Sequence, residues 1–210
     1  MPSTNTEPHF YEPKHGHGLP HSPFNAIVGP RPIGWIGSLS ADGIPNLAPY
    51  SFFNAFNYIP PIVGFASVGR KDSLNNIEAT GEFTWNLVTR ELAEAMNESC
   101  AAVGPEENEF ERAKLEQAPS SVIKAPRVAA SPVSFECKLT QIVQLMTQSG
   151  DTVPTWVVFG EVVGVHLAAG TLVDGIYDPA AMRTVLRAGG PASYYELTPD
   201  MHFEMHRPGV

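Results

Sequence analysis

Five consecutive residues, Gly69-Arg70-Lys71-Asp72-Ser73, bring two cationic side chains and a hydroxyl to the start of a predicted helix. Asp72 or Ser73 is the expected N-cap, because a short polar side chain accepts a hydrogen bond from the first free backbone N–H groups of a helix. Cations, a hydroxyl and free N–H groups at a helix start are the groups that bind a phosphate monoester. The pattern therefore predicts an anion site at residues 69–73.

The segment directly before this site, Ile62–Val68, is almost continuously apolar and lies between a Pro-Pro pair and Gly69. A short apolar run bounded in this way indicates a buried strand. An apolar strand beside an anion site offers the flat wall that an aromatic ring system needs. The two features together predict a phosphorylated aromatic cofactor.

Five blocks of the chain, in order, resemble the flavin reductase-like, FMN-binding split-barrel family, in its flavoredoxin-like branch. The first two blocks are RPIGWIGSLSADGIPNLAPYSFFNAF and KDSLNNIEATGEFTWNLV, and the match continues with RVAASPVSFECKL, FGEVVGVH and RAGGPASYYEL. The resemblance implies a six-stranded antiparallel Greek-key split barrel with peripheral α-helices. It also implies a homodimer with FMN at or near the subunit interface, and hydride transfer from NADH or NADPH to the flavin.

Polar residues interrupt the aromatic run from Asn46 to Asn54. Asn46, Ser51 and Asn54 lie among large apolar side chains, where each needs a hydrogen-bonding partner if buried. The edge of a flavin offers carbonyl and N–H partners, and Pro49 leaves the strand locally open because it cannot donate a ladder hydrogen bond. Backbone N–H groups near residues 46–51 are then expected to stabilise negative charge on the pyrimidine side of the ring. The alternative is that these residues simply pack a barrel interior.

The residue pattern and the resemblance together give a set of expected cofactor contacts. Arg31 precedes a proline and is therefore extended; the resemblance places it near the phosphate or ribityl chain, and a surface ion pair is the alternative. Tyr194 enters the set through the late loop that the family brings to the flavin. The full set is Arg31, Ser38, Asn46, Ala48, Pro49, Tyr50, Ser51, Asn54, Ser67, Arg70, Lys71, Asp72, Ser73 and Tyr194.

The elements that must position these residues are mostly short strands. The 20 prolines and 18 glycines are spread along the 210 residues, which favours many turns in a mainly β domain. Trp35 falls within an alternating strand and is expected in the core. Strands are expected at residues 33–39, 46–54, 62–68, 82–88, 133–146 and 155–166, and helices at 73–81, 89–102, 106–115 and 179–187.

The chain divides into an N-terminal arm, residues 1–23, and a single FMN-binding split-barrel domain, residues 24–210. The arm is rich in proline and carries four histidines, which invites comparison with a metal site. Glycine and proline between the histidines leave no rigid scaffold for a ligand set. An arm that wraps the barrel or a partner subunit is therefore the preferred interpretation, and no metal site is assigned.

The composition argues against several function classes. A net charge of −9 and a sequence pI near 5.2 disfavour binding to nucleic acid or to an anionic membrane surface. Cys100 and Cys137 show no CxxC spacing and are expected to be reduced thiols of a cytoplasmic protein. No apolar run approaches the ~20 residues that span a bilayer, so no membrane association is expected.

The sequence shows no Rossmann glycine motif, no P-loop and no motif of an activated nucleophile. The chemistry therefore belongs to the bound cofactor, and no catalytic side chain is expected. The expected function is an NAD(P)H-dependent FMN oxidoreductase, with a monooxygenase or another redox protein as a candidate partner. The alternative is a non-catalytic FMN electron carrier that serves a protein partner, and a β-barrel that binds no flavin is a third interpretation.

Overall fold

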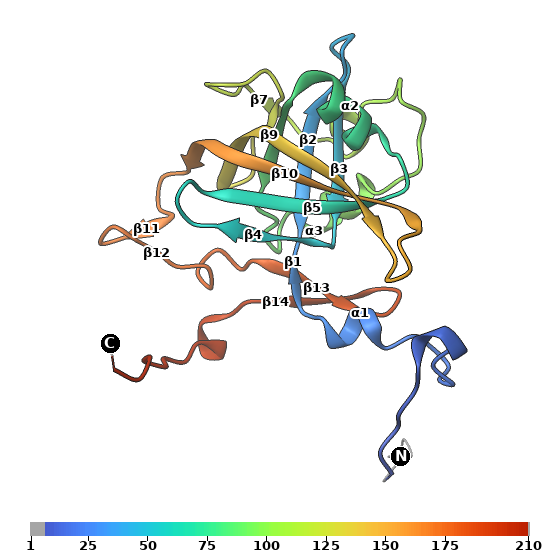
Figure 1. Cartoon of the computed structure of the whole chain (residues 1–210). Helices are drawn as coiled ribbons and strands as arrows, with labels where there is room; N and C mark the ends of the chain where they lie inside the picture. Colours follow the sequence, from blue (N-terminus) through green and yellow to red (C-terminus); the bar gives the residue numbers. More distant parts are fainter. Residues whose placement is uncertain (1–6, 210) are drawn as a thin grey trace.

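The structure of the protein, a computed structural model, describes residues 7–209. Residues 1–6 of the expected N-terminal arm lie outside the described residues. The rest of the arm lies beside the lower part of the molecule in Figure 1 and contains one short turn of 3-10 helix, Pro13–His15. No helix among residues 7–209 is long and apolar enough to cross a membrane.

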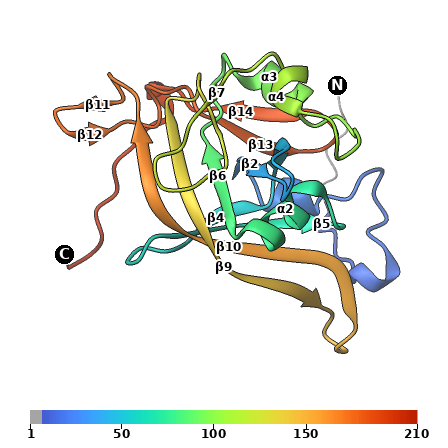
Figure 2. The ribbon, with the colours of Figure 1, turned by 90° about the horizontal axis from the view of Figure 1, so that it is seen from above.

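A seven-stranded antiparallel sheet forms the body of the molecule (Figures 1 and 2). Its strand order is β3-β2-β6-β9-β10-β5-β4. The bounds are β2 Gly34–Leu39, β3 Pro45–Tyr50, β4 Phe53–Asn57, β5 Ile62–Val68, β6 Glu82–Asn86, β9 Val133–Met146 and β10 Thr152–Leu167. Within the described residues this sheet has one strand more than expected, because the run expected as a single strand at 46–54 is divided into β3 and β4.

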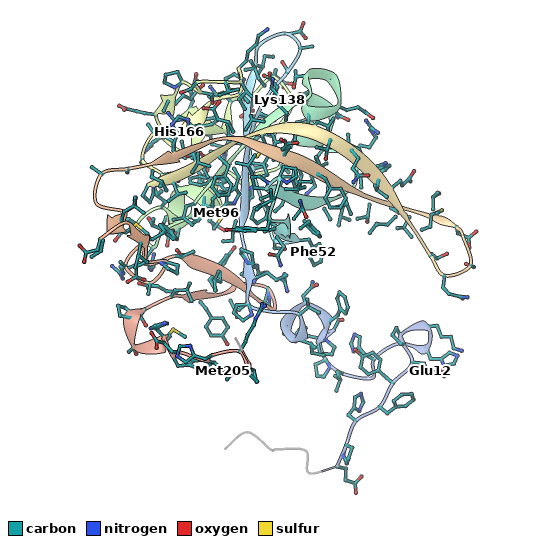
Figure 3. All side chains as sticks on the ribbon, turned by 60° about the vertical axis from the view of Figure 1, so that its left-hand side comes forward. Glu12, Phe52, Met96, Lys138, His166 and Met205 are labelled. Atoms are coloured by element: carbon teal, nitrogen blue, oxygen red, sulfur yellow. The ribbon has the colours of Figure 1, made fainter. Side chains whose placement is uncertain are left out.

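The sheet curls because its two edge strands are consecutive in the chain. β3 and β4 lie at opposite ends of the strand order, yet they are joined directly through Ser51 and Phe52. A connection this short brings the two edges together, so the sheet bends into a barrel. Figure 3 shows Phe52 at the lower rim of the barrel, on the side that faces the smaller sheet.

The smaller sheet has three strands in the order β1-β13-β14 and lies below the barrel in Figure 1. The strands are β1 Arg31–Pro32, β13 Val185–Gly189 and β14 Ser193–Glu196. The expected helix at 179–187 is therefore wrong: residues 179–183 form turns, and Val185 begins a strand. Two features exclude the helix, namely the left-handed φ of +48° at Arg183 and the pairing of β13 with β1, which lies far away in sequence.

Three helices surround the barrel: α2 Asp72–Thr80, α3 Ala93–Glu98 and α4 Glu109–Arg112. Both α3 and α4 are shorter than expected at 89–102 and 106–115. α2 buries Leu74 and Ile77 against the barrel and ends at Gly81, which takes the left-handed conformation that glycine adopts without strain. The N-cap is Lys71, so the helix begins one residue earlier than the sequence indicated. The remaining short elements are α1 Phe24–Ile27, β7 Gln117–Ala118, β8 Arg127–Val128, β11 Leu172–Val173, β12 Ile176–Tyr177 and the 3-10 turn Pro199–Met201.

Two hydrophobic clusters hold the elements together. The larger fills the barrel and includes Phe65 and Phe83, which meet edge to face at 5.9 Å. The second joins β2 and β3 to the helices outside the barrel through Trp35, Met96 and Phe110, and Figure 3 labels Met96 in this region. Trp35 is fully buried, as expected, and its indole N–H donates to Ser99 Oγ at 3.0 Å. This contact fixes the end of α3 against the barrel and so positions one wall of the site described next.

Candidate functional site

A cavity of about 360 Å³ lies where β3, the start of α2 and the segment after α3 meet. One side is formed by the small residues 99–102 and Val103, and Glu109 at the start of α4 also lines it. Eight residues from the expected cofactor-binding set line the cavity, and they come from two separate parts of the chain: Asn46, Ala48, Pro49, Tyr50, Arg70, Lys71, Asp72 and Ser73. The structure thus brings the polar run of β3 to the GRKDS segment.

The start of α2 gives the cavity a positive end. Lys71 is extended, and no side chain caps the first turn of the helix. The free N–H groups and the helix dipole therefore favour an anion there, and Arg70 and Lys71 add formal positive charge. Asp72 in the first turn complements the same dipole and partly offsets these cations.

The two cations differ in their partners. Arg70 forms an ion pair with Glu78 on α2, donates to Asn75 Oδ1 at 3.2 Å, and lies over the Trp156 ring at 5.6 Å. Lys71 places its ammonium group 5.8 Å from the centre of the Tyr50 ring. Within residues 7–209 no carboxylate lies within ion-pair distance of Lys71. Lys71 is therefore the cation whose charge is available to a ligand.

The hydroxyl group of Tyr50 is buried without a hydrogen-bonding partner. Burial raises the pKa of Tyr50, and the nearby hydroxyls of Ser73 and Ser67 lower it in part, although neither lies in hydrogen-bonding geometry. A buried unpaired donor costs about 1–3 kcal/mol, and such groups in native proteins call for an explanation. Tyr50 lines the cavity, and a ligand oxygen that reached this hydroxyl would supply the missing acceptor.

A polar cluster lies at the floor of the cavity. Asn46 contacts the Ser73 hydroxyl at 2.8 Å and the Ser38 hydroxyl at 3.3 Å, and Ser38 also accepts from Asn76 at 3.3 Å. Glu109, which is 5% exposed, accepts a hydrogen bond from the Leu47 N–H at 3.1 Å. Burial raises the pKa of Glu109, the N–H of Leu47 opposes the shift, and the charges of Asp72 and Glu107 add to it.

Four of the other expected contact residues hold the protein's own backbone or lie outside the cavity. Arg31 is buried, and its guanidinium donates to the carbonyls of Ser51, at 2.8 Å, and of Asn25 and Val28. Ser67 donates to the Gly69 carbonyl at 2.8 Å and so fixes the turn before α2. Asn54 is exposed on β4, and Ser51 lies in the β3–β4 connection.

Tyr194 lies at a second cavity, of about 530 Å³, between α3 and the β13–β14 pair. Its ring packs against the Arg187 guanidinium at 4.9 Å. This cavity is larger, but Glu94 and Glu196 line it together with Arg90, so its charge suits a phosphate less well. We therefore assign the site to the smaller cavity. The strand β5, expected as the wall for a ring, does not line that cavity; Ala48, Pro49 and residues 99–103 provide the wall instead.

Glu109 and residues 99–103 are parts of the site that the sequence did not indicate. Glu109 lies in a charged segment, where a glutamate is normally solvated, and it becomes buried because α4 packs against β3 through Phe110. No local pattern distinguishes it from Glu106, Glu107 or Glu111. Its role follows from the packing of elements that are distant in sequence.

A curled antiparallel sheet, with two cations beside a cavity at a helix start, places the protein in a class of small split barrels that can hold an anionic ligand. The chain belongs to the flavin reductase-like family, because the family model described as "Flavin reductase like domain" matches residues 29–185. The expected family and split-barrel fold are thereby confirmed. Membership makes the protein a flavin-related oxidoreductase.

Individual relatives agree with this placement. An uncharacterized protein of Halalkalibacterium halodurans is 35% identical over 188 residues, which cover 86% of this chain and 87% of the relative. The structure of nitrilotriacetate monooxygenase component B from Bacillus cereus is 29% identical, covers 98% of both chains and superposes with a TM-score of 0.81. The 2-nitrobenzoate 2-nitroreductase of Pseudomonas fluorescens is also 29% identical, with 89% of each chain covered and a TM-score of 0.77.

Proposed function

We propose that the protein binds FMN in the cavity between β3 and α2 and catalyses its reduction by NADH or NADPH. The observation that carries the proposal is that one cavity is lined both by Lys71, which lacks a carboxylate partner within the described residues, and by Tyr50, whose buried hydroxyl is unpaired. The volume of about 360 Å³ lies within the range of roughly 300–1,000 Å³ that is usual for small-molecule sites. These residues therefore fit a phosphorylated ring.

The phosphate end of the ligand is assigned to the start of α2. Lys71 and the free N–H groups of the first turn bind the phosphate, and Arg70 contributes long-range attraction while it remains paired with Glu78. The ring end is assigned to the wall formed by Ala48, Pro49 and residues 99–103. Small side chains on this wall allow a flat ring to lie close to the backbone.

Bound FMN supplies the redox chemistry, and the chain supplies position and charge. Leu47 donates its N–H to Glu109, so this N–H points away from β2. By strand alternation Pro49 is the next residue on that side, and it has no N–H to donate. The Ser51 N–H follows in the same alternation, just after the end of β3. Ser51 does not line the cavity, so we assign no free N–H of segment 46–51 on this side to the ring.

We further propose that the protein is a homodimer. Large apolar side chains are exposed along the β4–β5 turn and along the outer half of the β9–β10 hairpin. This hairpin projects from the barrel in Figure 2. The exposed residues are Phe56, Tyr58, Ile59, Val143, Leu145 and Met146. The two groups lie at opposite ends of β5, so they form two separate apolar areas, and exposed apolar surface of this kind is typical of a protein–protein interface. Similarity to a monooxygenase component B also supports a monooxygenase as a candidate redox partner.

Two measurements test the function. An absorption spectrum of the purified protein after addition of FMN should show a flavin band that remains with the protein during gel filtration. Oxidation of NADH or NADPH should then depend on both the protein and FMN. Bound flavin without turnover would identify an FMN electron carrier instead of a reductase, and absence of flavin binding would overturn the proposal.

A further inference from the structure

The carboxyl group of Glu109 is held rigidly at the floor of the cavity. It belongs to the first residue of α4, a turn capped by Asn108, whose side-chain oxygen accepts from the Phe110 N–H at 3.0 Å. Phe110 is fully buried and anchors the turn against β3. One carboxylate oxygen, Oε2, accepts from the Leu47 N–H at 3.1 Å, and the other, Oε1, faces the amide group of Asn46.

The amide of Asn46 fits the same space in two orientations that make different hydrogen bonds. The first sets the amide oxygen against Glu109 and the NH₂ group against the Leu47 N–H, so an ionised Glu109 disfavours it, and the second satisfies both groups. In the first, its NH₂ group donates to Ser73 Oγ at 2.8 Å and to Ser38 Oγ at 3.3 Å. In the second, the NH₂ group donates to Glu109 Oε1 at 3.3 Å, while the amide oxygen accepts from Ser73 Oγ at 2.8 Å and from the Leu47 N–H at 3.2 Å. The two orientations reverse the direction of the bond between Asn46 and Ser73.

The protonation of Glu109 selects between these orientations. An ionised carboxylate only accepts hydrogen bonds, so it favours the orientation in which the Asn46 NH₂ group faces it. Ser73 then gives its single hydroxyl proton to Asn46. A protonated Glu109 donates to the Asn46 oxygen, which turns the NH₂ group toward Ser73 and leaves the Ser73 proton available to an acceptor in the cavity.

We propose that Glu109 is a positioning residue for the phosphate of FMN: when protonated, it turns the Asn46 amide so that Ser73 donates to the bound phosphate. This inference rests on the proposed function. One proton is taken up as the phosphate binds, and it resides on Glu109. The nicotinamide and the flavin ring take no part in this step.

The charges around Glu109 agree with proton uptake. Asp72 from α2 and Glu107 from the segment before α4 are acidic neighbours, and together with burial they raise the pKa of Glu109. Lys71 and Arg70 line the same cavity and carry the opposite charge, and the thiol of Cys100 lines it as well. A bound phosphate adds negative charge close to Glu109 and so favours the protonated form further. Affinity for FMN therefore increases as the pH falls through the pKa of Glu109 in the complex. It becomes constant below the pKa of Glu109 in the free protein.

The test is a titration of the flavin-free protein with FMN, followed by flavin fluorescence between about pH 5 and about pH 8. Glu109→Gln supplies a permanently neutral side chain that donates to Asn46 and accepts from Leu47. The FMN affinity of Glu109→Gln should lack the pH dependence that Glu109 causes. Between the pKa of Glu109 in the free protein and its higher pKa in the complex, the variant should bind FMN more tightly than the wild type, by about tenfold for each pH unit above the lower pKa. The phosphate of FMN titrates at about pH 6, but it does so in every variant and cancels in the comparison.

Three further variants separate positioning from loss of charge. Glu109→Ala removes the charge but cannot donate, so it should bind FMN more weakly than Glu109→Gln. Glu106→Gln makes the same charge change at an exposed residue of the same segment that does not shift the pKa of Glu109, and it should retain the wild-type profile. Ser73→Ala lacks the hydroxyl that Glu109 directs, so in this background the effect of Glu109→Gln on the pH profile should shrink to the part that comes from charge repulsion alone.

The outcomes distinguish the two levels of inference. Wild-type protein that binds no FMN at any pH overturns the proposed function and this inference with it. Binding with identical pH profiles in wild type and Glu109→Gln, or equal affinities of Glu109→Gln and Glu109→Ala, overturns the positioning role while the FMN site stands. If the variants unfold, ¹³C NMR of the Glu109 carboxyl in the wild type decides: its pKa should rise when FMN is added, and an unchanged pKa contradicts the proposal.

Discussion

The ammonium group of Lys71 lies over the ring of Tyr50, 5.8 Å from its centre, and the hydroxyl of that ring has no hydrogen-bonding partner. The two side chains come from α2's N-cap and from β3, and both line the same cavity. The buried donor without an acceptor carries a cost that an oxygen-rich ligand removes, and the exposed ammonium group, which has no ion pair in the described chain, supplies charge for an anionic one. The following predictions start from this pair.

Replacement of Lys71 by alanine should weaken FMN binding about tenfold to a hundredfold, because one charge-assisted contact is lost. Arg70→Ala is the matched control, and it should cost less, because Arg70 is already paired with Glu78. Neither change should shift the free energy of unfolding of the flavin-free protein by more than about 1 kcal/mol. Calorimetric titration with FMN measures both effects, and a larger loss in Arg70→Ala would place the phosphate nearer to Arg70.

Tyr50→Phe should act in opposite directions on stability and binding. Removal of a buried unpaired hydroxyl should leave the flavin-free protein as stable or more stable, by up to about 1 kcal/mol, whereas FMN affinity should fall several-fold. Tyr58→Phe removes a hydroxyl from a side chain that is 85% exposed, and it should change neither quantity. Denaturant unfolding and FMN titration of both variants check the prediction; unchanged affinity in Tyr50→Phe would show that the hydroxyl does not meet the ligand.

Glu136 should govern acid stability at the other side of the barrel, near His166, which Figure 3 labels on β10. Burial would raise its pKa, but the His166 ring at 2.5 Å and the N–H groups of residues 121–123 together lower it from 4.5 to about 2. Because the folded-state pKa lies below the unfolded one, this stabilisation is complete above about pH 4.5 and is lost as the pH falls toward 2.

Glu136→Gln should therefore lower the free energy of unfolding at pH 7 by roughly 3 kcal/mol, and by less near pH 3. Glu116→Gln, at an exposed position, serves as the control and should unfold like the wild type. Urea unfolding at several pH values measures the difference. An equal loss of stability at pH 7 and at pH 3 would assign the effect to packing instead of charge.

The homodimer should appear in sedimentation at micromolar concentration as a species of twice the 22.7 kDa chain mass. Ile59→Asp, at a side chain that is 81% exposed, should shift the protein toward the monomer by placing a charge in the apolar surface. A wild-type protein that sediments as a monomer at this concentration would contradict the proposed homodimer.

Local patterns were sufficient to predict the residues of the candidate cavity that are contiguous in sequence. The GRKDS segment needs only a strand, a turn and a helix start, and Asn46 and Tyr50 follow from the alternation of one strand. Glu109 could not be assigned to the site from the sequence, because its burial depends on contact between α4 and β3. These two elements lie more than sixty positions apart in the chain, as the hydrogen bond between Leu47 and Glu109 shows.

Arg31 and β13 show a second limit. The sequence does not distinguish a buried arginine that donates to three backbone carbonyls from one that binds a phosphate, because both roles use the five donors of the guanidinium in their fixed geometry. At residues 185–189 the pairing with β1 overrides local helix preference. In both cases the partner that decides the outcome is distant in the chain.

The two-residue connection between β3 and β4 has a consequence for engineering. Residues inserted at Ser51 or Phe52 would separate the two edges of the sheet and displace the Ser51 carbonyl from Arg31. Insertions in this connection should therefore destabilise the fold. The tip of the β9–β10 hairpin, around Ser149 and Gly150, is exposed and closes on itself through the hydroxyl of Thr147. A peptide tag or reporter domain spliced in at this tip should leave the barrel intact, which makes the hairpin the natural attachment point for tethering the protein to a redox partner or an electrode.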